Sequence, residues 1–421
     1  MTVAAFRVRS FRFQWPADLL TSCAFEMETL ILGWYVMVST GSVLLLTVFG
    51  SLQFLGTLAA PMFGVLGDRL GGRAMLCAMR AIYAMLAALL MVLGLTGMLT
   101  PTWVLVVAAL GGVVRSNDIV MRHSLIGETM PPHHLIGALG MSRASTDVAR
   151  VAGALVGAGL SAVLGIGYAY VFVTSFYGAS LALTFGISRR RPVPDPSATP
   201  RRASLRASSG RDLKDGLVHV LRTPTMLALM WLAFVINLTA YPVTSGLLPY
   251  VAKRIYMVDA TGLGWLVASF SFGALLGSIT MVVTGGPRRP ERSMLVHTVI
   301  WYALLLGFGH VRIMGAGLLV LLLAGFVQSV AMISMTATLL AAAGDRFRSR
   351  VMGVRMLAVY GMAPGLLGTG VLIERVGYSW TISACCAVGL VFTLLIGFRW
   401  RASMWQSKRT TASTSAPQRV S

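Results

Sequence analysis

A carboxylate in the middle of the first long apolar segment, residues 16–38, is the group best placed to do chemistry. Successive residues of a helix are rotated by about 100° around its axis. If this segment is a helix, one side of it, about 80° wide, carries Asp18, Ser22, Glu26, Thr29 and Gly33. Glu26 lies about ten residues, or roughly 15 Å, into the segment, where an ionised carboxylate is costly in a bilayer. It could bind and release a proton, pair with a cationic substrate, or remain paired with an arginine for packing. Glu28, nearly opposite on the helix, is the competitor, because sequence does not fix the rotation of the helix.

Two later segments carry basic and acidic side chains at helical spacing. They are Arg115, Asp118 and Arg122 in residues 101–125, and Arg143, Asp147 and Arg150 in residues 135–163. Each set falls on one face of a helix, because residues three, four and seven apart are neighbours there. We expect Arg122, Arg143, Asp147 and Arg150 to form a structural charge network. Arg115 and Asp118 are candidates for a cavity, in which Arg115 could attract an anionic group.

A charged, glycine-rich stretch joins the second and third apolar segments. It reads GVLGDRLGGR over residues 64–73 and places Asp68, Arg69 and Arg73 among four glycines. Charges this close to lipid are costly unless they lie at the interface or in protein, and glycine allows tight turns and close helix approach. We interpret the stretch as a hinge between two membrane helices, with Asp68 facing the arginines of the following segments.

Polar side chains are sparse in the second half of the chain. Asn237 and Tyr241 lie one turn apart, and Pro242 interrupts the helix beside them. Gln328 and Tyr360 are further candidates for a cavity, and a hydrogen bond between helices is the alternative for each of the four. The apolar segments of this half hold no strong acid, so we expect any proton site in the first half.

The sequence offers no pattern for metal, nucleotide or covalent chemistry. The cysteines lie in apolar runs: Cys23, Cys77, Cys385 and Cys386. His133 and His134 are adjacent but have no third ligand nearby in the sequence. The lysines follow no phosphate-binding glycine loop, and no HExxH or GxSxG pattern occurs. We therefore expect no metal, no cofactor and no enzymatic activity.

The elements that must hold these residues are membrane helices. Only 12% of the 421 residues are charged, 56% are hydrophobic and the mean hydropathy is +0.76, whereas soluble domains carry about 25% charged residues. The net charge of +21 comes mostly from basic residues between the apolar runs, a pattern that sets membrane orientation and attracts anionic lipid. We expect an integral membrane protein that does not bind nucleic acid.

Twelve apolar segments are expected to form an all-α protein of two six-helix bundles. The segments are 16–38, 44–67, 74–97, 101–125, 135–163, 166–187, 224–250, 260–285, 293–312, 315–342, 351–373 and 379–399. We divide the chain into a first bundle (1–187), a basic linker (188–222), a second bundle (223–400) and a disordered tail (401–421). Arginine-rich connections on one side predict that both termini are cytoplasmic. The linker is either a tether or, over 211–222, a short helix on the membrane surface.

The hinge carries a resemblance to a known family. The signature G-x-x-x-D-R-x-G-R-R is matched by Gly64, Asp68, Arg69, Gly71 and Arg73, whereas Gly72 stands where a basic residue is usual. The chain thus resembles the major facilitator superfamily. The resemblance implies a monomeric secondary transporter whose two bundles rock about a midplane site, with Asp68 in a cytoplasmic gate.

A second resemblance concerns the branch of that superfamily. NDIVMRHSLIGETMPPHHLIGAL (117–139), with Asp147, Arg150 and Gly153, and RSRVMGV (348–354) are similar to the enterobactin exporter and macrolide efflux proteins. This implies proton-driven export of a drug-like compound or siderophore across a bacterial inner membrane. Ala154 follows Gly153, where drug antiporters often have proline, which weakens the case for antiport. Uptake by the same fold, and a receptor or lipid-handling protein without transport, are the alternatives.

Overall fold

The computed structural model shows an all-α protein. It describes residues 6–56, 71–115, 117–130, 132–187, 218, 220–221 and 223–400. The gate residues Gly64, Asp68 and Arg69, nearly all of the predicted linker and the predicted tail therefore lie outside the described residues, as do the side chains of His133, His134 and Arg143.

The first group of helices overlaps the apolar segments of the first half, and the expected helix 101–125 is divided between two of them. These helices are α1 (Arg9–Thr40), α2 (Val43–Leu52), α4 (Gly72–Leu95), α5 (Pro101–Arg115), α6 (Asp118–Thr129) and α7 (Pro132–Phe185). Gly41 ends α1 in the left-handed conformation, with φ of 65°, and its N–H bonds to the Met37 carbonyl. Gly165, with φ of 78°, breaks α7 into two arms, which correspond to the two expected helices 135–163 and 166–187.

The second group differs more from the expected segments. It comprises α9 (Pro224–Thr239), α10 (Tyr241–Ser245), α11 (Leu248–Tyr250), a π-helical turn (Val251–Ile255), α12 (Ala260–Val283), α13 (Pro290–Phe308), α14 (Met314–Leu357), a 3₁₀ turn (Ala358–Gly361), α15 (Met362–Val376) and α16 (Tyr378–Arg399). The expected helix 224–250 is thus three pieces, with a proline in the first turn of both later pieces. In contrast, α14 runs on into the start of the expected segment 351–373.

Five segments among the described helices are long and apolar enough to cross a membrane by length and composition. They are Gly72–Leu95, Ser145–Phe185, Ala260–Val283, Met314–Ala343 and Tyr378–Arg399. Large apolar side chains on many helices remain exposed, including Val163, Val282 and Phe398. Such surfaces suit contact with lipid tails, as the composition predicts.

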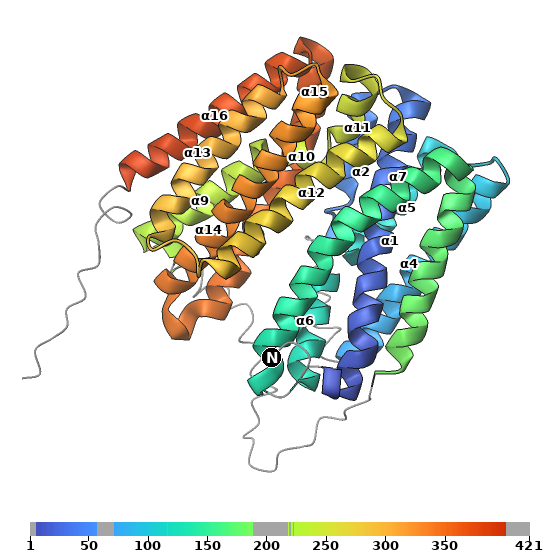
Figure 1. Ribbon diagram of the computed structural model, residues 1–421, viewed down its shortest axis with the longest axis horizontal. Helices are drawn as coiled ribbons and strands as arrows, with labels where there is room; N and C mark the ends of the chain where they lie inside the picture. Colours follow the sequence, from blue (N-terminus) through green and yellow to red (C-terminus); the bar gives the residue numbers. More distant parts are fainter. Residues whose placement is uncertain are drawn as a thin grey trace, which may run out of the picture.

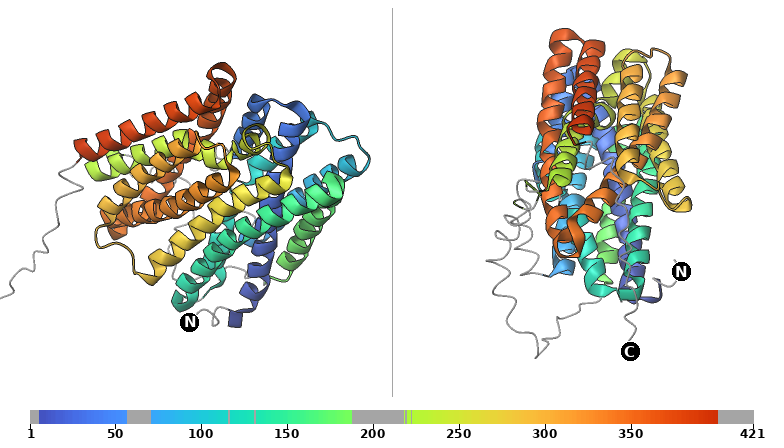
Figure 2. Two further views of the ribbon diagram at one scale, coloured as in Figure 1. Left: turned by 45° about the horizontal axis from the view of Figure 1, so that its top comes forward. Right: turned by 90° about the vertical axis from the view of Figure 1, so that its left-hand side faces the viewer.

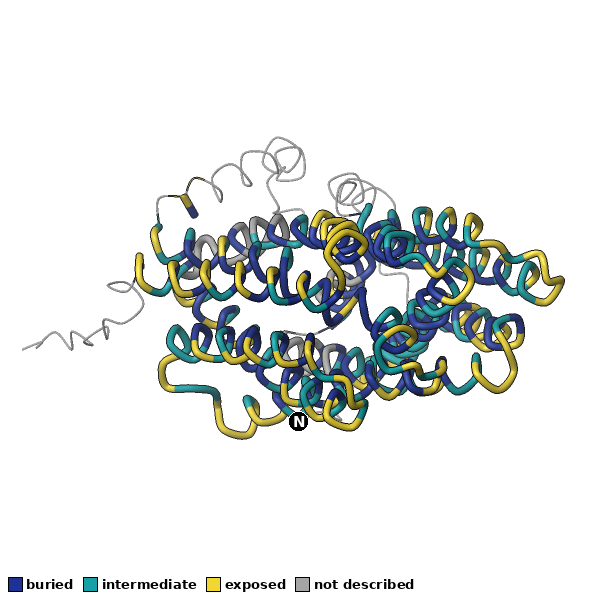
Figure 3. The backbone as a smooth tube through the Cα atoms, turned by 90° about the horizontal axis from the view of Figure 1, so that it is seen from above, coloured by how far each residue is buried: buried dark blue, intermediate teal, exposed yellow. Residues whose placement is uncertain are grey.

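The helices form two bundles that meet at one end and diverge toward the end where the N-terminus lies (Figure 1). The first bundle is built by α1 and α4 packing on α7, and the second by α12 and α13 packing on α14. The bundles contact each other through α7 with α12 and through α2 with α15. Figure 2 shows the same two groups from two other directions, and Figure 3 shows buried backbone within each group and exposed backbone around the outside.

Small residues allow the bundles to approach where they meet, which we term the closed end. A Cβ added at Gly264 of α12 would lie 2.4 Å from Ala158 of α7, and one at Gly370 of α15 would lie 2.0 Å from Thr47 of α2. Ser51 also donates a hydrogen bond of 3.1 Å to the Ala363 carbonyl. Glycine and alanine are the residues that let membrane helices pack this closely.

The short connection between α1 and α2 is held by charged side chains of the second bundle. Glu374 Oε1 accepts hydrogen bonds from Ser42 Oγ (3.2 Å) and from the Leu44 N–H (3.3 Å), and Arg254 donates one to the Gly41 carbonyl (3.4 Å). The N-terminus of α2 favours a negative charge at this position. We call these contacts the α1–α2 clasp.

Glu374→Ala is expected to shift the protein toward states in which the closed end has opened. Because the Glu374 side chain is exposed, we expect the closed-end state to lose about 0.5–1 kcal/mol of stability. This corresponds to a roughly two- to fivefold change in the ratio of closed to open molecules. The check is the distance distribution between spin labels at Ser39 and Arg375. Glu291→Ala, which removes a carboxylate from the first turn of α13, is the control. Equal distributions in both variants would show that the clasp does not hold the closed end.

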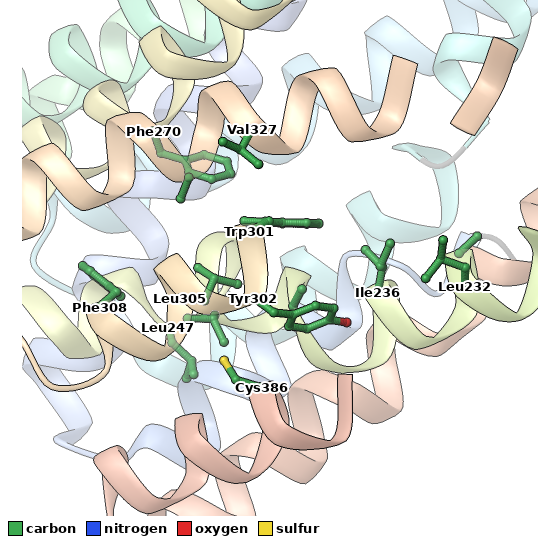
Figure 4. Close-up of a cluster of buried hydrophobic side chains, with 14 of the residues drawn as sticks. Leu232, Ile236, Leu247, Phe270, Trp301, Tyr302, Leu305, Phe308, Val327 and Cys386 are labelled. Carbon is green, nitrogen blue, oxygen red and sulfur yellow. The ribbon is translucent and has the colours of Figure 1, made fainter. Parts of the chain in front are cut away.

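The core of the second bundle centres on two aromatic residues of α13. Trp301 and Tyr302 are both fully buried (Figure 4). The Tyr302 and Thr239 hydroxyls lie 2.7 Å apart, which satisfies both polar groups within the core. The Trp301 ring meets the Tyr241 ring edge to face, with 5.6 Å between centroids. The core thereby fixes Tyr241, which is one of the candidate site residues.

Candidate functional site

Glu26 on α1 and Arg150 on α7 form an ion pair, with 3.4 Å between Glu26 Oε1 and Arg150 Nε. Gly153 lies one turn after Arg150, and a Cβ there would be 2.9 Å from the Glu26 Cβ and 3.0 Å from the Cys23 carbonyl oxygen. The missing side chain thus lets α1 and α7 approach closely enough for the pair to form. The Arg150 side chain keeps 37% of its surface exposed and that of Glu26 keeps 17%.

The second bundle presents Tyr241 and Gln328 toward this pair. Gln328 Nε2 donates a hydrogen bond of 2.9 Å to the Tyr241 hydroxyl, and Tyr241 interacts electrostatically with Arg150. Asn237 instead donates to the carbonyl of Ala233 on its own helix, at 2.8 Å. Gln328 and Tyr241 are thus joined within the second bundle, and Tyr241 lies within electrostatic range of Arg150 in the first. Tyr360 lies in the 3₁₀ turn and is partly buried.

Glu28 lies on the other side of α1, inside the first bundle. It accepts a hydrogen bond of 2.8 Å from the Tyr177 hydroxyl and lies 3.7 Å from Arg115 Nη2. Arg115 also donates to Gln53 Oε1 (2.8 Å) and to the Phe25 carbonyl (3.1 Å). These groups line a small cavity of about 20 Å³, enough for a single water molecule.

The walls of this cavity come from the first bundle alone. The lining residues are Glu28, Thr29, Leu32, Phe49, Gln53, Tyr83, Leu86, Val107, Ala108, Gly111, Gly112, Arg115 and Tyr177. Glu28 and Arg115 thus pair beside a cavity inside the first bundle, whereas Glu26 pairs with Arg150 on the face of α7 that packs against α12.

A cluster of four buried charges joins α1, α4 and α6. Arg80 bonds to the Asp18 carboxylate and to the Thr184 hydroxyl, and Arg122 bonds to the Asp118 carboxylate one turn earlier on its helix. Arg122 Nε also lies 3.7 Å from Asp18 Oδ1. The four charged side chains are at most 8% exposed. Two acids and two bases thus neutralise each other away from water.

The cluster contains two candidate residues singled out from the sequence, Asp118 and Arg122, and one that was not, Arg80. Asp118, a cavity candidate, is buried with Arg122 rather than beside Arg115. Arg122, predicted to belong to a charge network, does form one, with Asp18 and Asp118 as partners. Arg80 could have been found as the lone charge in the middle of the apolar segment 74–97, where an arginine is expensive without a partner.

The described part of the predicted gate adds three observations. Gly71 has a φ of 82° immediately before α4, a conformation that favours glycine. Arg73 donates a hydrogen bond to the Phe185 carbonyl, and Asp147 is buried in α7. Within the part of the chain that the structure describes, no cluster of three His, Cys, Asp or Glu side chains could hold a metal ion.

Residues 17–368 match the model of the Major Facilitator Superfamily. The chain belongs to this superfamily. No curated protein matches the chain in sequence. The predicted resemblance to the superfamily is confirmed, and the exporter branch stays a prediction.

Solved structures of superfamily type share the fold at low sequence identity. A bacterial homolog of the human lysosomal transporter Spinster, in an inward-facing and unoccupied conformation, has a TM-score of 0.69 at 15% identity, covering 94% of this chain and 98% of that one. The nucleoside transporter NupG has a TM-score of 0.68 at 13% identity, covering 94% and 100%. The human organic anion transporter MFSD10 (TETRAN) has a TM-score of 0.63 at 17% identity, covering 92% and 99%. The chain is thus a membrane transporter of this fold, in a family that is generally not enzymatic.

Proposed function

We propose that the protein is a proton-coupled secondary transporter that moves a small amphipathic molecule by alternating access. The observation that supports this most is the placement of Glu26 and Arg150. They lie within long helices of the first bundle and keep part of their surface exposed. Arg150 shares a face of α7 with Ala154 and Ala158, which lie against Gly264 of α12 in the second bundle. A partly open ion pair between two movable bundles suits a site that binds cargo and changes its charge state.

The arrangement of the bundles supports a site with access from one side. The α7–α12 and α2–α15 contacts and the α1–α2 clasp all lie at the closed end. With both termini in the cytoplasm, as the arginine distribution predicts, this state faces the cytoplasm. Transport then requires that the closed-end contacts break while contacts form at the opposite end, where we place the gate of Gly64, Asp68, Arg69, Gly71 and Arg73.

Protons are the coupling ion in this proposal, and Glu26 is the group that carries them. Protonating Glu26 removes the negative member of its pair with Arg150 and so changes the charge presented to the second bundle. We propose export from a bacterial cell as the direction, on the resemblance to exporters, with a drug-like compound or a siderophore as cargo. No cofactor is required. Uptake, and a membrane receptor or lipid-handling protein that does not transport, are the rival hypotheses.

Glu26→Gln is expected to abolish gradient-driven accumulation, because glutamine cannot exchange a proton. The measurement is movement of two fluorescent amphipaths of opposite charge, ethidium and carboxyfluorescein, in proteoliposomes with an imposed pH gradient. We expect accumulation to fall at least about tenfold, whereas exchange without a gradient continues.

Glu28→Gln serves as the matched control for this experiment, because it removes the other first-helix carboxylate inside the first bundle. Full gradient-driven accumulation by Glu26→Gln would show that Glu26 is not the coupling group. If the wild-type protein moves neither dye with either polarity of the gradient, the receptor hypothesis gains over transport.

A further inference from the structure

The Arg150 guanidinium has N–H donors that make no hydrogen bond to the described residues. Arginine carries five N–H donors. Among the hydrogen bonds of the described residues, Arg150 makes one, through Nε to Glu26. Its terminal nitrogens are not among the buried polar atoms without a partner, and 37% of the side chain is exposed. The outer fork of the guanidinium is therefore accessible, and its geometry matches a carboxylate in a bidentate pair.

Arg150 lies on the face of α7 that packs against the second bundle. Along one face of α7, Arg150, Ala154 and Ala158 follow at spacings of four residues. A Cβ at Gly264 of α12 would meet the Ala158 Cβ and the Ala154 carbonyl oxygen, at 2.4 and 3.3 Å. Arg150 is one turn further from the closed end than Ala154. It therefore lies on the face of α7 against which α12 packs, and 37% of its side chain is exposed.

The second bundle supplies a further donor beside Arg150. Because Gln328 Nε2 donates to the Tyr241 hydroxyl, the Tyr241 O–H remains able to donate to another acceptor. The Trp301 ring fixes the position of the Tyr241 ring. An anionic oxygen between the two bundles would accept from Arg150 on one side and from Tyr241 on the other.

Arg115 does not have this freedom. It lies near Glu28 and bonds to Gln53 and to the Phe25 carbonyl, all within the first bundle. Its side chain is 15% exposed and borders a cavity of about 20 Å³, with room for a single water molecule. Of the two arginines that pair with first-helix glutamates, Arg150 is therefore the one that can receive cargo.

We infer that the cargo is an amphipathic acid whose carboxylate binds between the Arg150 guanidinium and the Tyr241 hydroxyl. This inference rests on the proposed transport function and names the class of its substrate. A ligand held by both bundles at once links occupancy of the site to the relative position of the bundles, which is what alternating access requires.

The test compares binding of an acid with that of its uncharged counterpart. The probes are naphthalene-2-carboxylate and naphthalene-2-carboxamide, which have similar shapes and differ in charge, and the readout is saturable protection of the purified full chain against thermal unfolding. We expect the carboxylate to bind at least about tenfold more tightly than the amide, because only the carboxylate can form a hydrogen-bonded ion pair with Arg150.

Substitutions at Arg150 and Tyr241 test whether these two side chains cause the difference in affinity between acid and amide. Arg150→Gln is expected to weaken carboxylate binding at least about tenfold and Tyr241→Phe about three- to tenfold, with amide binding unchanged. Arg312→Gln is the control, because it removes one positive charge from an exposed side chain that bonds to Ser379 within the second bundle. Should Arg150→Gln fold poorly, the neutral double variant Glu26→Gln/Arg150→Gln takes its place.

Three results would overturn the inference: no saturable protection by the carboxylate, equal affinity for acid and amide, or wild-type carboxylate affinity without Arg150. Its failure is distinct from failure of the transport function. Gradient-driven movement of ethidium by a wild-type protein that shows no saturable carboxylate binding would refute the acid site and keep the transporter. Carboxylate binding without movement of either dye would keep the site and refute transport.

Discussion

Arg80→Gln is expected to lower the free energy of unfolding by about 3 kcal/mol, since breaking a buried ion pair leaves a charge without compensation. The Arg80 side chain is fully buried and bonds to Asp18 and Thr184. We place the loss at the lower end of the usual range because Arg122 stays 3.7 Å from Asp18 and retains part of the neutralisation. The measurement is thermal unfolding of the purified protein, together with the yield of monodisperse material.

A double variant separates charge from packing in this prediction. Asp18→Asn/Arg80→Gln removes one acid and one base and leaves the Asp118–Arg122 pair neutral. We expect it to be more stable than either single variant, as coupled residues require. Arg312→Gln, at an exposed position, controls for loss of a positive charge as such. A stability of Arg80→Gln equal to that of Arg312→Gln would contradict the role of the buried cluster.

Gly273→Ala is expected to destabilise the second bundle by about 1–3 kcal/mol, because a methyl group has no room there. Its Cβ would lie 1.9 Å from the Leu322 carbonyl oxygen, and backbone cannot move aside as a flexible side chain can. Because α12 and α14 pack along much of their length, a local separation of the helices disturbs many contacts. Thermal unfolding of the purified variant measures the loss.

The matched control for this glycine is Gly368→Ala in α15. Gly368 is exposed, and an added Cβ there meets nothing within 4 Å. Since alanine favours a helix over glycine by about 1 kcal/mol, this variant should be as stable as the wild type or more so. A Gly273→Ala protein as stable as Gly368→Ala would show that the two helices do not need close contact at this position.

The sequence predicted the class of fold because a membrane span is set by length and apolar composition. It could not place the helix breaks in the second bundle, where Pro242 lies at the start of a new helix inside a segment that has no charged residue. It also could not show that α14 continues to Leu357. The order of apolar and polar residues indicates which side of a segment can be buried. It says less about where the backbone of that segment changes direction.

The sequence suggested candidate residues for a site, but not how those residues pair. Asp118 was grouped with Arg115 by assuming one continuous helix. In the structure α5 ends at Arg115 and α6 begins at Asp118, and Asp118 pairs with Arg122 of its own helix. Glu26 could be identified from its depth, whereas its pairing with Arg150 depends on the contact between α1 and Gly153. Such contacts between distant segments are set by tertiary packing, which spacing within one helix does not reveal.

The buried cluster of Asp18, Arg80, Asp118 and Arg122 has an electrical consequence. One elementary charge that crosses a membrane potential of 100 mV gains or loses about 2.3 kcal/mol. The cluster carries two positive and two negative charges in close contact, so its movement with the first bundle couples to voltage only weakly. The Glu26–Arg150 pair is neutral in the same way until a proton or an anion joins it. In the proposed transport cycle, membrane voltage would therefore act mainly on the Glu26–Arg150 site with a proton or cargo bound. It would have little effect on the movement of these charged groups when the site is empty.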